Sequence, residues 1–183
     1  LSFNGQRCTA LKLIFVQKDV AEEFTKKLTD AVSALKGGLP WEKDVKITPL
    51  PEVNKPPYLE ECIADAVSKG AKVLNENGGY NEASFVFPAV VCPVNDQMKL
   101  YHEEQFGPVI PVVPFDTIEE PIDYQVNADH GMQVSIFSED ALEVSKLIDP
   151  FVNLVSRVNI NCQAQRGPDV FPFTGRKDSA EGT

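Results

Sequence analysis

Residues 12–35 read KLIFVQKDVAEEFTKKLTDAVSAL, and this stretch indicates the class of fold. Its first six residues, KLIFVQ, are short and rich in branched apolar side chains, which is typical of a buried strand. After Asp19, a plausible N-cap, apolar residues recur at helical spacing until Gly37 and Gly38 end the pattern. The face that we expect to be buried comprises Val20, Phe24, Leu28, Ala31, Val32 and Leu35. The stretch therefore predicts a strand followed directly by a helix.

The alternation of strand and helix patterns continues along the chain. Further helices are predicted at residues 58–69, 117–128 and 140–149. Further strands are predicted at residues 71–74, 84–92, 133–138 and 156–162. Such alternation indicates an α/β fold, a three-layer arrangement in which an open, mostly parallel sheet carries helices on both faces.

Two segments that contain several prolines are harder to assign. Residues 41–57 are interpreted as an extended loop. Residues 107–115, GPVIPVVPF, are apolar, but each proline removes a donor from a strand ladder. We therefore expect this second segment to form an edge strand or an irregular one.

The charge of the chain restricts its partners. The 183 residues contain 17 Lys and Arg against 27 Asp and Glu, which gives a formal net charge of −10. A field of this sign repels nucleic acid and anionic membranes, and no apolar run approaches the roughly 18 residues of a membrane span. We expect a small-molecule partner and neither a nucleic-acid nor a membrane partner. A phosphorylated substrate would need arginines that reverse the field locally.

The cysteines are widely spaced. Cys8, Cys62, Cys92 and Cys162 form no CxxC pair, and His102 and His130 are the only imidazoles. This pattern argues against a metal site and favours reduced thiols in a cytoplasmic protein.

The first ten residues, LSFNGQRCTA, contain a candidate nucleophile. Gly5 before Cys8 and the small residues Thr9 and Ala10 after it allow a tight turn, in which backbone N–H groups point at the sulfur. Such groups, or a neighbouring cation such as Arg7, lower a thiol pKa and favour the nucleophilic thiolate. The alternative is a buried, inert cysteine, and for an isolated cysteine the residues alone favour that interpretation.

Three segments, in order, resemble motifs of the aldehyde dehydrogenase superfamily. Residues 3–10, FNGQRCTA, are similar to the active-site segment of that family. Residues 103–109, EEQFGPV, resemble its EE-x-FGPV segment. Residues 158–161, VNIN, together with residues 173–179, FTGRKDS, resemble its VN-x-N and PF-G-x-K-x-S region. The resemblance covers essentially the whole chain.

The resemblance implies a reaction and roles for several residues. Cys8 would attack an aldehyde to give a thiohemiacetal, hydride would pass to NADP or NAD, and water would release the acid from the resulting thioester. The Cys8 backbone N–H would stabilise the oxyanion, Glu104 would bind the nicotinamide ribose and Phe106 would pack against the nicotinamide. Without the resemblance, the pair Glu103 and Glu104 would be interpreted as solvated charges.

Two arginines bear on the choice of aldehyde. Arg7 precedes Cys8, and Arg166 lies in the later segment QRGPDVFPF. The planar guanidinium suits bidentate contact with a phosphate, and Thr9 is a further candidate for contact with the substrate. The combination of QRCTA with RGPD-x-FPF resembles the non-phosphorylating, NADP-dependent glyceraldehyde-3-phosphate dehydrogenases. That branch implies oxidation of glyceraldehyde 3-phosphate to 3-phosphoglycerate.

Several alternatives stay open at this point. Arg7 and Arg166 could be salt-bridged structural residues, and the substrate could be a non-phosphorylated aldehyde or a semialdehyde. A non-catalytic scaffold with an unreactive Cys8 is a third possibility.

The resemblance also implies an organisation for the whole protein. Residues 1–183 would form the cysteine-bearing catalytic domain of a longer, cytoplasmic homo-oligomer, a tetramer or a dimer. The cofactor-binding domain, the general-base glutamate and the oxyanion-hole amide would precede this chain, and an assembly strand would follow it, so that the chain alone would be inactive or nearly so. At Ala180 the family usually has glycine, and alanine would be strained there if φ were positive.

Overall fold

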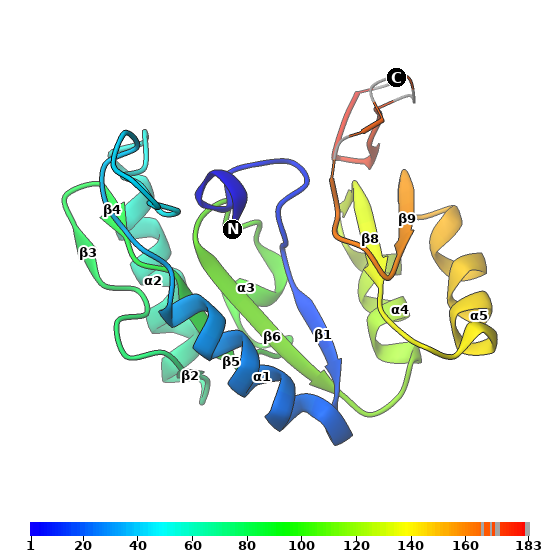
Figure 1. Ribbon diagram of the computed structural model, residues 1–183. Coiled ribbons are helices and arrows are strands. Elements are labelled where there is room, and N and C mark those ends of the chain that lie inside the picture. The colour runs from blue at the N-terminus through cyan, green and yellow to red at the C-terminus, as the bar shows by residue number, and fades with distance from the viewer. Residues whose placement is uncertain (166, 169, 171–172, 182–183) are drawn as a thin grey trace. The chain divides into compact units, whose positions relative to one another are not determined.

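The computed structural model describes residues 1–165, 167, 168, 170 and 173–181 (Figure 1). They group into two compact units, one formed by residues 1–7 and 11–116, the other by residues 8–10 and the described residues from 117 onward. Each unit encloses buried clusters of apolar side chains of its own. The expectation of one catalytic domain over residues 1–183 stays a prediction.

The first unit is built on a four-stranded sheet. Its strands, in spatial order, are β1 (Ile14–Gln17), β6 (Val109–Phe115), β5 (Ala89–Cys92) and β2 (Lys72–Val73). Strands β1 and β5 run parallel to β6, and β2 runs antiparallel to β5. The predicted, mostly parallel sheet is confirmed, with one antiparallel strand at its edge.

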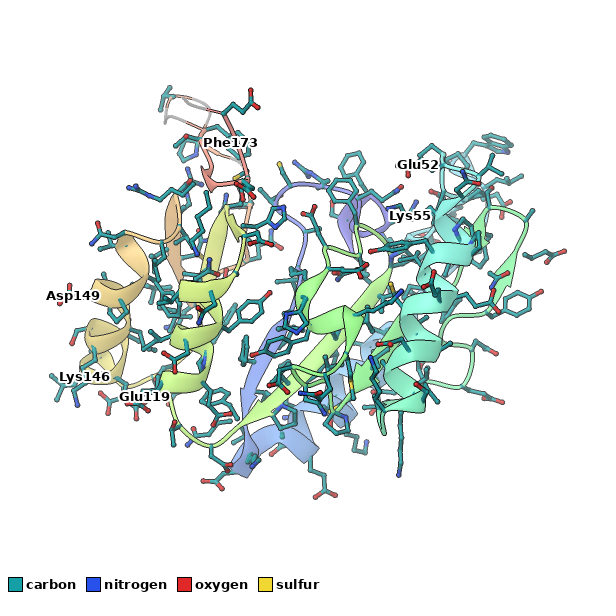
Figure 2. All side chains as sticks on the ribbon, turned by 180° about the vertical axis from the view of Figure 1, so that it is seen from behind. Glu52, Lys55, Glu119, Lys146, Asp149 and Phe173 are labelled. Carbon is teal, nitrogen blue, oxygen red and sulfur yellow. The ribbon has the colours of Figure 1, made fainter. Side chains whose placement is uncertain are left out.

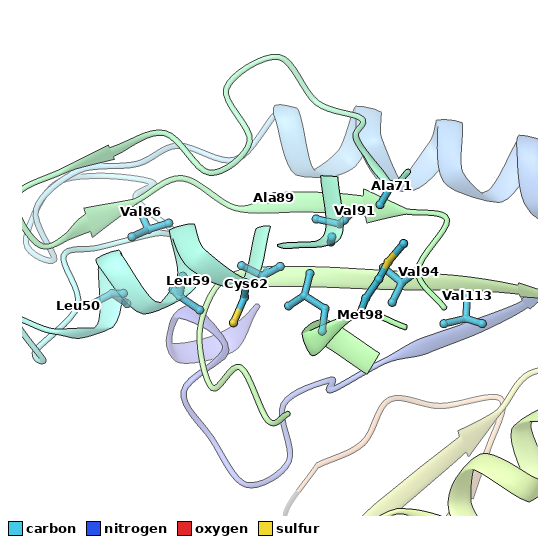
Figure 3. Packing of buried hydrophobic residues seen from close by; sticks show 13 residues of the cluster. Leu50, Leu59, Cys62, Ala71, Val86, Ala89, Val91, Val94, Met98 and Val113 are labelled. Carbon is cyan, nitrogen blue, oxygen red and sulfur yellow. The ribbon is translucent and has the colours of Figure 1, made fainter. Parts of the chain in front are cut away.

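Helices cover both faces of this sheet, because successive strand residues point to opposite sides. Even-numbered residues such as Val90 and Val112 pack with Val32 of α1 (Lys18–Ser33). Odd-numbered residues such as Val91 pack with Leu59 of α2 (Lys55–Ser68) and with the short α3 (Lys99–His102). Figure 3 shows the second of these clusters. Each fully buried valine or leucine contributes about 1.5–3 kcal/mol, so both layers of helices are held firmly.

Shorter elements complete the first unit. The 3-10 turn η1 (Ser2–Gly5) opens the chain, and strands β3 (Asn81–Glu82) and β4 (Phe85–Val86) form an antiparallel hairpin. None of the described helices is both long and apolar enough to cross a bilayer.

The second unit contains a parallel pair of strands, β8 (Gln133–Ile136) and β9 (Arg157–Ile160). Helices α4 (Glu119–Asn127) and α5 (Ala141–Val152) pack on them through a core that includes Ile136, Val144 and Phe151. Asp140 caps α5, since its Oδ1 accepts hydrogen bonds from the N–H groups of Leu142 and Glu143. Strand β7 (His130–Gly131) pairs antiparallel with β10 (Arg176–Lys177).

The prediction that residues 107–115 form an edge or irregular strand is wrong. Strand β6 lies between β1 and β5, although Pro111 and Pro114 each remove a ladder donor. Val109 and Val112 are at most 1% exposed. The burial of apolar side chains on both faces of a parallel sheet outweighs the two missing donors.

Two predictions at helix starts are also wrong. Residues 41–57 are not all loop, because α2 begins at Lys55 with Pro56 and Pro57 in its first turn, where a missing N–H costs nothing. In α1, Gln17 is the N-cap and Asp19 lies in the first turn. Of the face predicted to be buried, Leu28, Val32 and Leu35 do pack toward the sheet, whereas Val20, Phe24 and Ala31 are exposed and Ala21 faces the sheet in their place.

Candidate active site

The segment before Cys8 is a tight turn with an unusual backbone. Phe3, Asn4 and Gly5 have φ values of 52°, 56° and 75°. Asn4 is 7% exposed and is held at both ends of its amide: Nδ2 donates to Thr48 Oγ1 at 3.0 Å, and Oδ1 accepts from the Thr48 N–H at 3.0 Å. Asparagine tolerates a positive φ better than most residues. The turn is therefore fixed by a buried residue that motif reasoning had not singled out.

Gly5 brings the cysteine segment against the EEQFGPV segment. A Cβ on Gly5 would lie 2.5 Å from the carbonyl oxygen of Gly107, so the two backbones are in direct contact. Phe106, immediately before Gly107, is half-buried and has a φ of 45°. Glu104 lies two residues earlier and is exposed. Two of the three motifs thus meet within the first unit.

Arg7 follows this turn and is half-buried. Its guanidinium carbon lies 4.9 Å from the centroid of the Phe3 ring, which is a cation–π contact. Cys8, the next residue, is an exposed free thiol, and Thr9 and Ala10 are half-buried. Cys8, Thr9 and Ala10 group with the second unit.

Two hollows adjoin the cysteine turn and α2. The first has a volume of about 390 Å³, and the second of about 280 Å³. The first is lined by Phe3, Asn4, Gln6, Thr48, Pro49, Pro51, Glu52 and Phe106. The second is lined by Glu52, Asn54, Lys55, Tyr58 and Glu104. Because Glu52 borders both, the candidate cofactor residues Glu104 and Phe106 line neighbouring spaces; Figure 2 marks Glu52 and Lys55 at the start of α2.

Glu103 and Glu104 differ in their surroundings. The Tyr58 hydroxyl donates a hydrogen bond of 3.0 Å to Glu103 Oε2. Burial and this bond to a carboxylate raise the pKa of Tyr58, so the phenol stays protonated and keeps donating. Glu103 is therefore engaged by α2, whereas Glu104 lines the hollow.

The asparagines of the VNIN segment hold strands together. Asn159 is 8% exposed, and its Nδ2 donates to Gln133 Oε1 and to the Val134 carbonyl, both at 3.1 Å. Asn161 accepts from the Ser138 N–H and donates to the Ser138 carbonyl. The contacts of this motif tie β9 to the strand beside it.

The turn at residues 175–180 is also structural. Ser179 Oγ accepts a 2.8 Å hydrogen bond from the Gly131 N–H. A Cβ on Gly175 would lie 2.8 Å from Ser179 Cβ and 2.9 Å from Ala180 Cβ, so glycine is required there. The positive φ in this turn falls on Lys177, at 54°, and not on Ala180. Alanine in place of the family's usual glycine is therefore unstrained.

Lys177 holds the end of α4, and we expect Lys177→Met to lower the melting temperature. Its Nζ donates to the carbonyl oxygens of Gln125, Val126 and Ala128 at 2.6, 3.0 and 2.6 Å. A cation at a helix C-terminus stabilises by about 0.3–1 kcal/mol when exposed, so the expected shift in the larger full-length protein is about 1–2 °C at most. A thermal melt of the full-length protein followed by circular dichroism measures the shift. Lys177→Arg should restore most of it, and equal melting of Lys177→Met and the parent would contradict the role.

Arg157, the first residue of β9, binds the backbone on either side of position 166, where the second predicted substrate arginine lies. Arg157 Nη1 donates to the carbonyl oxygens of Gln165, at 3.1 Å, and Gly167, at 2.7 Å. Arg166 itself lies outside the described residues, so its predicted contact with the substrate stays a prediction. In the part of the chain that the structure describes, no group of three or more His, Cys, Asp or Glu is placed to hold a metal ion.

Comparisons with known proteins agree with these motifs. The profile of the family described as "Aldehyde dehydrogenase family" matches residues 1–183. The NADP-dependent glyceraldehyde-3-phosphate dehydrogenase of Streptococcus equinus is 35% identical over 180 residues, which are 98% of this chain and 37% of that protein.

Solved structures of other proteins share the fold of this chain. The NADP-dependent glyceraldehyde-3-phosphate dehydrogenase of Bacillus halodurans C-125, complexed with NADP, matches with a TM-score of 0.90 at 35% identity, over 97% of this chain and 36% of that one. The succinate-semialdehyde dehydrogenase of Burkholderia pseudomallei matches with a TM-score of 0.90 at 31% identity, over 99% of this chain and 37% of that one. This chain thus spans somewhat more than a third of the relatives that it matches. The chain belongs to the aldehyde dehydrogenase family.

Proposed function

We propose that the protein containing this chain oxidises glyceraldehyde 3-phosphate to 3-phosphoglycerate, with Cys8 as nucleophile and NADP as hydride acceptor. The observation that carries the proposal is the backbone contact between Gly5 and Gly107. It holds the turn before Cys8 against the turn that carries Phe106. The first unit therefore contains both the residues that lead up to Cys8 and the candidate cofactor residues.

The residues that line the hollows suit a nicotinamide nucleotide. Glu104 offers carboxylate oxygens, which accept hydrogen bonds from a ribose diol, and Phe106 offers an aromatic face to a flat ring. Bound NADP supplies a hydride acceptor. The preference for NADP over NAD is supported by relatives, since both the Streptococcus and the Bacillus proteins are NADP-dependent.

The thiol of Cys8 carries the covalent chemistry. The thiol releases its proton to solvent, its sulfur bonds to the aldehyde carbon, and the electron pair of the C=O bond moves to the oxygen, where the Cys8 N–H can stabilise the charge. One such donor is typically worth about 10²–10³ in rate. Loss of hydride from that carbon leaves a thioester on Cys8. Water then adds to the thioester, the C–S bond breaks with its electrons on sulfur, and the acid leaves as a proton is released.

Arg7 is the described residue that best suits the phosphate. It is a permanent cation in a chain of net charge −10, and the Phe3 ring restricts where its guanidinium can lie. A preorganised fork of donors loses less conformational freedom when it binds an anion. Thr9, one residue beyond Cys8, stays a candidate for contact with the substrate.

A second candidate substrate is a semialdehyde that carries a carboxylate. The Burkholderia protein, with a TM-score of 0.90, is a succinate-semialdehyde dehydrogenase. A guanidinium also binds carboxylates bidentately, so Arg7 suits either anion. A cytoplasmic location and a dimeric or tetrameric assembly of the whole protein stay predictions, the first supported by four free thiols among the described residues.

The test is an assay of NADPH formation by the full-length protein with three aldehydes, in buffer free of phosphate and arsenate. With glyceraldehyde 3-phosphate, we expect Arg7→Gln to raise KM about 10- to 100-fold, the equivalent of one lost charge-assisted contact. With acetaldehyde, KM should stay within about twofold of the parent value, because no anion is present. A parent that prefers succinate semialdehyde would establish the second substrate, and equal effects of Arg7→Gln on all three aldehydes would contradict the anion-binding role.

A further inference from the structure

Gln105 lies between the two candidate cofactor residues and has no role in the proposal above. It is 2% exposed, and its Nε2 donates to the carbonyl oxygens of Leu11, Lys12 and Val109 at 3.3, 3.0 and 3.0 Å. All three acceptors are carbonyls, so the orientation of the amide is determined. The Oε1 atom is buried and has no hydrogen-bond partner among the described residues. The side chain is thus used entirely as a donor, with two acceptors in the segment between Cys8 and β1 and the third at the start of β6.

Lys12 makes a second contact between the same two segments, this time from its own side chain to the backbone of α3. Its Nζ donates to the carbonyl oxygens of Leu100, at 2.7 Å, and Tyr101, at 3.2 Å, within α3. Burial lowers the pKa of Lys12 to about 8, although the nearby Glu104, Cys62 and Glu103 oppose the shift. The burial of a lysine ammonium is unfavourable unless its N–H donors have hydrogen-bond acceptors. Carbonyl oxygens at the end of a helix are favourable acceptors for it.

The contacts of Lys12 and Gln105 lie on either side of Glu103 and Glu104 in the sequence. Lys12 holds residues 100 and 101, and Gln105 follows directly after Glu104. Only residues 102–104 separate the two attachment points. On the other side, both contacts fall on residues 11 and 12, which precede β1 and come three and four positions after Cys8 in the sequence. The loop that carries Glu104 and Phe106 is therefore attached twice to the segment that continues from the nucleophile.

We propose that Lys12 and Gln105 are positioning residues that fix the loop of Glu104 and Phe106 to the segment that continues from Cys8. The inference rests on the proposed function, because it concerns the same hydride-transfer site. Neither residue touches the reacting atoms. Their effect is to hold the cofactor residues in one position, and a displacement of about 1 Å at such a site can cost about 10²-fold in rate.

The test compares Gln105→Glu, Lys12→Met and Lys12→Arg in the full-length protein. A carboxylate at position 105 keeps the shape but turns acceptor atoms toward three carbonyl oxygens, and methionine at position 12 removes the ammonium that donates both hydrogen bonds to α3. We expect kcat to fall about 10- to 100-fold in these two variants. We also expect the deuterium isotope effect on kcat, measured with aldehyde deuterated at C1, to increase as hydride transfer becomes rate-limiting. Lys12→Arg keeps its donors and should recover most of the rate.

A matched control separates positioning from folding. Asn75 is 4% exposed in the same unit, and its amide holds two backbone groups, the Pro88 carbonyl at 2.8 Å and the Val90 N–H at 2.9 Å. Asn75→Asp makes the same change from amide to carboxylate away from the cofactor loop. It should lower the melting temperature and leave the isotope effect unchanged.

Each outcome decides the inference. Parent values of kcat and isotope effect in folded Gln105→Glu and Lys12→Met would overturn it, and so would an equal rise of the isotope effect in Asn75→Asp. If Gln105→Glu does not fold, Lys12→Met and Lys12→Arg decide the matter. If the parent is inactive on every aldehyde, the proposed function fails. Titration of NADPH fluorescence then tests the inference separately: a Kd raised several-fold in Lys12→Met and restored in Lys12→Arg supports it, and unchanged affinity overturns it.

Discussion

Cys8→Ser in the full-length protein is expected to lower kcat for aldehyde oxidation by at least roughly 10³-fold, without a change in fold. Serine has nearly the same shape, but its hydroxyl is a far weaker nucleophile unless a base activates it. The side chain of Cys8 is exposed, so the substitution removes no core packing. Initial rates of NADPH formation under saturating aldehyde measure the loss.

Cys162 provides the control for this prediction. It is the other exposed cysteine among the described residues, whereas Cys62 is buried. Cys162→Ser should leave kcat within about twofold of the parent, since the proposed reaction gives this thiol no role. Low concentrations of iodoacetamide at neutral pH should label Cys8 faster than Cys162. Equal labelling, together with an active Cys8→Ser variant, would favour the unreactive scaffold.

The layers of the fold were predictable because they depend on local patterns. The spacing of apolar residues in 12–35 was sufficient to predict β1 and α1. Strand β6 was not predictable in the same way. Its prolines weaken the ladder locally, and what places it in the centre is burial by α1 on one face and α2 on the other, two helices that lie about 40 or more positions earlier in the chain.

Some residues of the candidate site were predictable from sequence motifs, and others were not because their roles depend on distant contacts. Cys8, Glu104 and Phe106 were predictable from motifs, because short segments of sequence carry them. Lys12 and Gln105 were not, since a lysine before a strand and a glutamine after two glutamates both resemble solvated residues. Their burial exists only once residues 11–12 and 100–109 lie side by side. Polar residues whose partners are distant backbone carbonyls leave no periodic signal in a sequence.

Gly5→Ala is expected to be the most damaging change outside the nucleophile. At a φ of 75° alanine costs about 1 kcal/mol of backbone strain. In addition, its Cβ would lie 2.5 Å from the Gly107 carbonyl oxygen and 3.0 Å from the carbonyl carbon, and backbone atoms cannot rotate away as a side chain can. The turn before Cys8 must therefore separate from the turn that carries Phe106. We expect kcat to fall about 10²-fold, as for a displacement of about 1 Å.

Gly70→Ala separates the two components of this effect. Gly70 also has a positive φ, 101°, but nothing lies within 4 Å of the Cβ that alanine would add. The control variant should therefore show the strain alone, a stability loss of about 1 kcal/mol in a urea titration, with kcat unchanged. A folded Gly5→Ala with the parent kcat would show that the contact between Gly5 and Gly107 does not set the geometry of the site. A loss confined to Gly5→Ala would show that it does, because both glycines carry a left-handed backbone and only one of them joins two motifs.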